Sequence, residues 1–214
     1  MDIEMLNPHV MKILVSARDV DSINSISHRI GLSYGWTHYW AKRLIDVGVF
    51  EGSRTKLSLN RTNPFYHKVL NFIHDSFKED TSFHYSILSL FGIKYCFTKT
   101  DAVFVWTNGG YNIARFRDYY PIFIKVAEED RDLLEYYCRK LNLRVSQKKG
   151  IFYSVEFVKD IKAARHNNVP VDSLDDTIHF MMENKYNFEP ALEMVQKLYR
   201  KRLGVRYQEA IVNV

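Results

Sequence analysis

Apolar residues recur with helical spacing in two short segments at the start of the chain. The first segment follows Pro8, a residue favoured in the first turn of a helix, and its apolar positions continue up to a polar break at residues 19–21. In the second segment three isoleucines share one face, with Ser22 placed to cap the helix and Gly31 placed to end it. The pattern therefore predicts two short helices in succession.

A third helix and a hairpin are predicted directly after these two. Ser33 can cap a helix that runs from about Tyr34 to Val47. Residues 49–50 and 56–59 have the character of short strands, and Gly52-Ser53 is suited to the turn between them. Three helices followed by such a hairpin indicate a winged helix-turn-helix.

One more helix is predicted to complete the N-terminal part. It begins at Asn63-Pro64, and the polar stretch 78–82 after it is the best boundary between domains. We therefore expect a winged-helix domain over residues 1–78 and a second domain over residues 83–214. The predicted apolar stripe of this helix consists of Phe65, Val69, Phe72, Ile73 and Phe77.

The pattern changes beyond residue 82, where runs rich in β-branched and aromatic residues alternate with helical segments. The whole chain is therefore predicted to be α+β, with the winged helix-turn-helix followed by a mixed α/β C-terminal domain. Ser173 can cap a helix that ends near Glu183, and Pro190 can begin a last helix that reaches Gly204. The predicted strands are 95–97, 102–106, 122–126 and 151–158, and the other predicted helices are 86–91 and 130–141.

Composition and charge narrow the class of protein without choosing a function. Hydrophobic residues make up 46% of the chain and charged residues 26%, which is enough for a packed core with an ordinary solvated surface. The net charge of +5 favours anionic partners in general. Cys96 and Cys138 lack the paired spacing of a zinc site, so we expect two buried reduced thiols. With no basic and apolar leader and no long apolar run, we expect a cytoplasmic protein without membrane contact.

The third helix carries the candidate chemistry. In a helix-turn-helix this helix enters the major groove of DNA, so one side packs inward and the other exposes hydrogen-bonding groups. The spacing predicts that Leu32, Thr37, Ala41 and Leu44 face inward and that Trp40 closes the edge of the core. The candidate contacts to double-stranded DNA are Ser33, Tyr34, Trp36, His38, Tyr39, Lys42 and Arg43 on the helix and Arg54, Lys56 and Arg61 on or beside the hairpin.

The same residues have structural explanations that stay open. Trp36, Tyr39 and Trp40 can pack against the first helix or against a partner subunit. Lysines and arginines on a helix are commonly just solvated, and charges on a hairpin suppress aggregation between strand edges.

The segment from residue 8 to residue 62 resembles the winged-helix regulators of the multiple-antibiotic-resistance and related prokaryotic families. The resemblance rests on Gly31-Leu32-Ser33, on Lys42-Arg43-Leu44 in the next helix and on the hairpin that follows. It implies a transcription regulator that binds duplex DNA, and the two-fold half-sites of such motifs suggest a homodimer.

Residues 95–106 and 169–183 resemble the effector half of AbiEi-type antitoxin regulators, which couple a winged helix to an α/β domain and regulate a partner nucleotidyltransferase. This implies a dimerisation or partner-binding role for the second domain. It also keeps open an alternative function, in which the winged helix itself binds a protein instead of DNA.

No residue pattern in the chain supports catalysis. Asp101 begins an apolar run but lacks the second carboxylate that metal-bound phosphoryl transfer needs. A nuclease built from Asp101, Glu156 and Lys159 is weakened because the last two do not share a strand face. His67 and His74 have no further metal ligands at a suitable spacing. We therefore predict no enzyme, no metal and no cofactor.

Overall fold

The computed structural model describes residues 5, 7–113, 115–116, 118–147 and 149–207 of an α+β protein. The chain divides into two compact units, which are described separately. The first comprises Met1–Ile93 together with Asp132–Arg144, and the second comprises Lys94–Arg131 together with Val145–Val214. The first unit thus takes in residues well beyond position 78, and the expected domain limits 1–78 and 83–214 stay a prediction.

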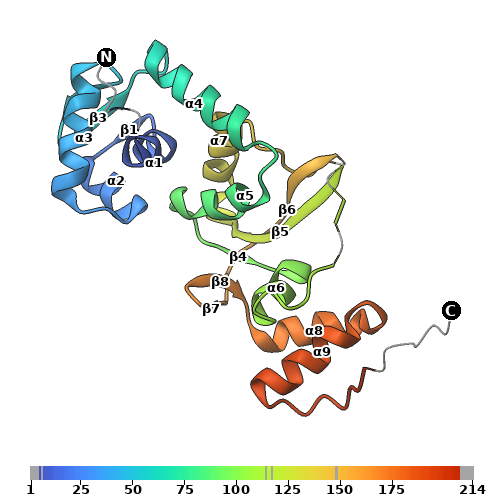
Figure 1. Cartoon of the computed structure of the whole chain (residues 1–214). Helices are drawn as coiled ribbons and strands as arrows, with labels where there is room; N and C mark the ends of the chain where they lie inside the picture. The colour runs from blue at the N-terminus through green and yellow to red at the C-terminus, as the bar shows by residue number, and fades with distance from the viewer. Residues whose placement is uncertain (1–4, 6, 114, 117, 148, 208–214) are drawn as a thin grey trace. The chain divides into compact units, whose positions relative to one another are not determined.

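The first unit begins with three helices and a small antiparallel sheet whose strand order is β1-β3-β2 (Figure 1). The order of helices and strands is that of a winged helix-turn-helix, as expected. Further helices follow the hairpin, and α7 joins them from much later in the chain. The elements are α1 (Pro8–Ser16), β1 (Val20–Asp21), α2 (Ile23–Ile30), α3 (Tyr34–Asp46), β2 (Phe50–Ser53), β3 (Lys56–Leu59), α4 (Pro64–Phe77), α5 (Thr81–Ile87), the 3₁₀ turn η2 (Leu88–Leu90) and α7 (Arg131–Leu141).

Local signals in the sequence determine where these helices begin and end. The Ser22 hydroxyl accepts from Ser25 N at 3.0 Å, and the Ser33 hydroxyl accepts from Trp36 N at 3.3 Å. Gly31 has φ 66°, a left-handed conformation that favours glycine at the end of a helix. The predicted caps of α2 and α3 are therefore confirmed.

The apolar stripe of α4 is narrower than predicted. Phe65, Val69 and Ile73 are buried, but Phe72 is 54% exposed, so its prediction as a core residue is wrong. The helix buries Tyr66 beside Phe65, which turns the stripe away from position 72.

The second unit contains a mixed five-stranded sheet with strand order β6-β5-β4-β8-β7 (Figure 1). Strands β5 and β6 run parallel over their full length, β4 and β8 are also parallel, and the other two pairings are antiparallel. A helical core includes Met181, Phe188 and Leu192, and a second cluster packs Ala102 and Trp106 against the sheet residue Val171. The elements are β4 (Tyr95–Phe97), α6 (Lys99–Trp106), β5 (Tyr119–Ala127), the 3₁₀ turn η3 (Glu128–Asp130), β6 (Gly150–Val158), β7 (Ala163–His166), β8 (Val169–Asp172), α8 (Leu174–Glu183) and α9 (Lys185–Tyr199).

The predicted strand 102–106 is wrong, because these residues lie in helix α6. Val103 is buried in the core formed with α8 and α9, and Ala102 is buried against the sheet residue Val171. Packing on two sides decides the conformation here, since β-propensity is weak compared with such tertiary contacts.

The predicted hairpin turn and the predicted start of the last helix also differ from the structure. The hairpin turn lies at Arg54–Thr55 and not at Gly52-Ser53, which belong to β2. Pro190 lies inside α9, which begins at Lys185. The missing N–H of this proline would have paired with the carbonyl of Tyr186, and water can satisfy that carbonyl because Tyr186 is fully exposed.

In the described part of the chain, each helix is either too short or too polar to span a bilayer.

Candidate nucleic-acid interface

Helix α3 divides into an inward and an outward side, as predicted. Thr37, Trp40, Ala41 and Leu44 are buried, while Leu32, in the turn before the helix, is half-buried. On the outward side the three aromatic residues near the helix start are each more than 40% exposed: Tyr34, Trp36 and Tyr39. Large apolar side chains held this far in solvent are a feature of surfaces that bind something.

The outward side chains of α3 are ordered by contacts with one another. The rings of Trp36 and Tyr39 are stacked with centroids 5.6 Å apart, and those of Tyr34 and His38 are stacked at 6.0 Å. Arg43 Nη1 donates to the Tyr39 hydroxyl at 2.8 Å, and its guanidinium lies 5.4 Å from that ring. We call these five residues, with Lys42, the α3 surface. Its conformation is set before any partner arrives, which lowers the entropic cost of binding.

The hairpin forms a short wing that is anchored to the rest of the unit. The carbonyl of Arg54, in the turn, accepts from Ile23 N at 3.1 Å, so the turn lies against the start of α2. The Arg54 and Lys56 side chains are exposed. The wing turn that carries these two cations is therefore fixed through its backbone against the start of α2.

Arg61 does not belong with the other cations of the wing. It lies five residues beyond Lys56 along a strand that runs away from the turn, on the order of 15 Å from it. Its guanidinium donates to both carboxylate oxygens of Asp19, at 2.7 and 2.6 Å, and lies 5.3 Å from the ring of Tyr136. The hydrogen bond with Asp19 raises the pKa of Arg61. The sequence gives no sign of this pairing across more than forty residues.

The α3 surface and the wing carry an excess of positive charge. Residues 34–56 contain two carboxylates, Asp46 and Glu51, against four cations, Lys42, Arg43, Arg54 and Lys56. Ser33, also a candidate, is committed to the cap of α3 through its hydroxyl oxygen, but that hydroxyl still has a proton to donate. The arrangement can place four cations and several aromatic faces against a polyanion.

Asp101 and the two cysteines, which were singled out in the sequence, are buried. Asp101 forms a buried ion pair with Arg115 at 3.0 Å and accepts from Phe123 N at 2.8 Å. Among the described residues no group of three or more His, Cys, Asp or Glu side chains could hold a metal ion. Cys96 and Cys138 are buried and free, as predicted, and burial raises the pKa of each thiol to about 12.

A buried polar cluster in the second unit was not predicted. Lys125 Nζ lies 2.9 Å from Asp172 Oδ2, and Thr98 donates to the same carboxylate. The three side chains come from β5, from β8 and from the residue after β4, and only the folded sheet brings them together.

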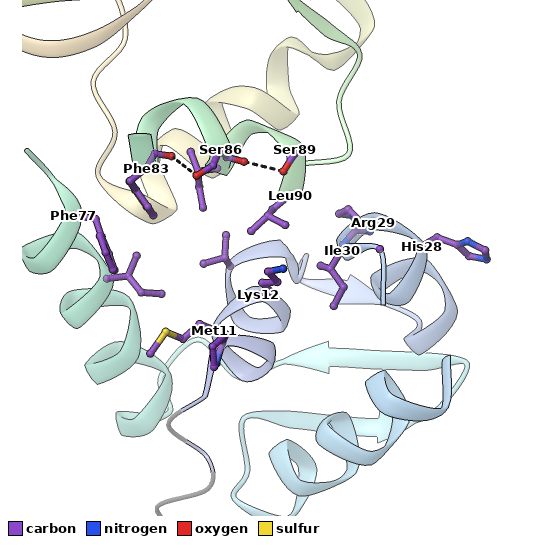
Figure 2. Close-up of a pocket in the computed structure, with 15 residues that line it drawn as sticks. Met11, Lys12, His28, Arg29, Ile30, Phe77, Phe83, Ser86, Ser89 and Leu90 are labelled. Carbon is purple, nitrogen blue, oxygen red and sulfur yellow. Dashed lines mark hydrogen bonds between the residues drawn. The ribbon is translucent and has the colours of Figure 1, made fainter. Parts of the chain in front are cut away.

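The first unit also contains an apolar cavity of about 560 Å³, shown in Figure 2. Phe77 of α4, Phe83 of α5 and Leu90 of η2 contribute to its lining, and Met11 of α1 and Ile30 of α2 lie across from them. Its volume is that of a small-molecule pocket. No motif in the sequence marks it, because its walls come from five separate elements.

Comparison with known proteins found no matching family model, no matching curated protein and no matching solved structure. The two resemblances described above therefore stay predictions, and function has to be argued from the geometry of the chain itself.

Proposed function

We propose that this chain binds double-stranded DNA, with the α3 surface in the major groove and the wing on the phosphate backbone. One observation supports this most directly: a helix-turn-helix whose second helix exposes ordered aromatic and cationic side chains, beside an anchored basic turn. A major groove admits one α-helix, and its base edges offer partners for such side chains.

Each part of the surface has a distinct task in this proposal. Tyr34, Trp36 and His38, in the first two turns of α3, contact base edges and thymine methyl groups. Lys42, Arg54 and Lys56 neutralise phosphates and set the register of the protein on the duplex without selecting a sequence. We assign Arg61 no part in this contact, because it lies on the order of 15 Å from the wing turn.

As a biological role, we propose transcription regulation by a homodimer. A single recognition helix contacts only a short half-site, and a two-fold pair doubles the contacts. Within this proposal the second unit supplies dimerisation or binds a protein partner.

The experiment is a titration of the whole chain with short duplexes, followed by fluorescence anisotropy between about 50 and 200 mM salt. Lys42→Gln/Lys56→Gln removes two phosphate contacts and should lower the slope of log K against log salt by about 2. The matched control is Lys68→Gln/Lys159→Gln, which removes two exposed lysines outside the surface and should leave the slope unchanged. Equal slopes for both double variants, or no binding at the lowest salt, would overturn the proposal.

A second function, binding of a protein partner by the α3 surface, is favoured by the identity of its residues. Trp, Tyr and Arg are the residue types that dominate the energy of protein interfaces, and Trp36, Tyr39 and Arg43 lie together here. Weak binding to duplex DNA that does not depend on salt would favour this alternative.

A further inference from the structure

A second cavity of the first unit has walls of a different chemistry. It has a volume of about 410 Å³ and lies between α4, α7 and the residues that follow the hairpin. Among the described residues that line it, three are lysine or arginine and none is aspartate or glutamate. We call this site the cationic cavity, and its polar and aromatic lining consists of Arg61, Tyr66, His67, Tyr136, Arg139 and Lys140, beside Asn71.

Arg61 and Lys140 are held in place by groups outside this cavity, whereas Arg139 is loosely paired. Asp19 fixes Arg61 through two hydrogen bonds but does not line the cavity. Arg139 is 73% exposed, and among the described residues it pairs loosely with Glu135, at 3.5 Å on the same helix. An ion pair this exposed contributes little energy, so the guanidinium is available to an incoming anion.

Lys140 is the most constrained of these groups. Its Nζ donates to the carbonyls of Leu14 at 2.6 Å and Ala17 at 2.7 Å, and it lies 5.6 Å from the ring centroid of Tyr66 and 5.9 Å from that of Tyr136. A protonated ammonium has a third N–H to donate. Burial lowers the pKa of Lys140 to about 7, so a nearby negative charge would stabilise its protonated form.

We propose that the cationic cavity binds a phosphate monoester of about mononucleotide size. Arginine matches the oxygens of a phosphate with a planar fork of donors, and His67 and Lys140 add further donors around the same space. The tyrosine walls accept the uncharged part of the ligand. The volume lies in the range of small-molecule sites.

This inference does not depend on DNA binding. The cavity lies at the far end of β3 from the turn that forms the wing. Binding of its ligand is measured in a titration that contains no DNA. A phosphate could come from a free nucleotide or from the backbone of DNA, and the hollow shape of the site favours the free molecule. The experiment separates the two sources.

The test is calorimetric titration of the whole chain with adenosine monophosphate, inorganic phosphate, adenosine and a short duplex, each in turn. Arg139→Gln and His67→Ala change exposed side chains and leave the buried contacts of Lys140 intact. Lys197→Gln is the matched control, because Lys197 is 72% exposed and also pairs with a glutamate four residues away on its helix. We expect the monophosphate to bind and adenosine not to bind. Arg139→Gln should weaken monophosphate binding about tenfold or more, and Lys197→Gln should leave it unchanged.

Each other outcome counts against the proposal. Absence of monophosphate binding, or equal affinities in wild type, Arg139→Gln and His67→Ala, would remove the site. If the monophosphate does not bind but both variants weaken binding of the duplex, the cations serve the DNA backbone and the nucleotide site is overturned.

Discussion

Arg29 and Asp21 form an ion pair at 2.7 Å with only 6% and 3% of their side chains exposed. Arg29 Nη1 also donates to the carbonyl of Ser16 at 2.7 Å, and Asp21 accepts from the backbone N–H of Arg18 and of Ser22. The pair therefore joins α2 to β1 and to the end of α1, and α1 and α2 are the helices that pack against α3 in the winged helix.

Removing one partner of this pair should destabilise the protein strongly. Arg29→Met leaves Asp21 buried without its counter-ion and should lower the free energy of unfolding by about 3–5 kcal/mol. The double variant Asp21→Asn/Arg29→Met removes both charges and should lose less than Arg29→Met alone. Urea unfolding followed by circular dichroism measures both, and equal losses would contradict a coupled pair.

Lys140 should make the free energy of unfolding depend on pH, and this dependence should be absent from Lys140→Met. Burial lowers its pKa to about 7 in the folded chain, against 10.5 as the ordinary value, so between these pH values the unfolded chain holds a proton that the folded chain lacks. Below pH 7 the folded chain is thus destabilised by the full free-energy cost of burying the charged ammonium, and this cost declines as the pH rises. The free energy of unfolding of the wild type should rise relative to Lys140→Met by up to about 1.4 kcal/mol per pH unit.

The environment of Lys140 supports that sign. Asp19 and Asp21 raise its pKa while Arg29 and Arg61 lower it, and the rings of Tyr66, Tyr136 and Tyr137 surround it, so desolvation stays the dominant cause. Lys68→Met, which removes an exposed lysine of α4, is the control and should keep the pH dependence of the wild type. A constant difference between wild type and Lys140→Met from pH 6 to 9.5 would show that the ammonium is not desolvated.

Ser33 allows the cap of α3 to be separated from the proposed contact with DNA. Ser33→Ala removes the acceptor for Trp36 N and should cost about 1 kcal/mol of stability. Ser33→Asp keeps an acceptor and should preserve stability, but its negative charge should repel phosphate and weaken duplex binding. Thermal unfolding and the anisotropy titration give the two quantities. Unchanged duplex affinity in Ser33→Asp would place the start of α3 away from DNA.

The helix boundaries of the winged helix could be predicted because they depend on neighbours in sequence. Ser22, Gly31 and Ser33 act within a few residues of their own positions, through a side-chain cap or a left-handed backbone. The same reasoning could have found the β7–β8 hairpin, whose turn is Asn167-Asn168 with φ 48° and 64°. That signal was present in the sequence and was missed.

The rest of the site depends on contacts between distant residues. Lys140 bonds to Leu14 and Ala17 across more than one hundred and twenty positions, and neither its spacing nor its surroundings in sequence mark it as buried. Helix α6 was predicted as a strand because local preference cannot show that Val103 is packed by α8 and α9. The outward residues of α3 were predictable from periodicity, whereas the pairing of Arg61 with Asp19 was not.

Substitution of Gly52, the glycine of the wing, should destabilise the protein. Gly52 lies in β2 with φ 109°, and a Cβ at this position would meet the carbonyl oxygen of Lys56 at 2.4 Å. Gly52→Ala must therefore distort the strand pair beside the turn, and we expect a loss of about 1–3 kcal/mol in the free energy of unfolding. If duplex binding depends on the wing, its affinity should fall as well.

Gly35 gives the matched comparison within the same winged helix. It lies in α3, and a Cβ there would meet nothing within 4 Å. Gly35→Ala should therefore raise the free energy of unfolding by about 0.5–1 kcal/mol, because alanine loses less backbone entropy than glycine when a helix forms. Chemical denaturation of the two variants checks both signs. A stable Gly52→Ala protein would mean that the turn does not have the backbone conformation described here, and the position of Arg54 and Lys56 beside α2 would then have to be abandoned.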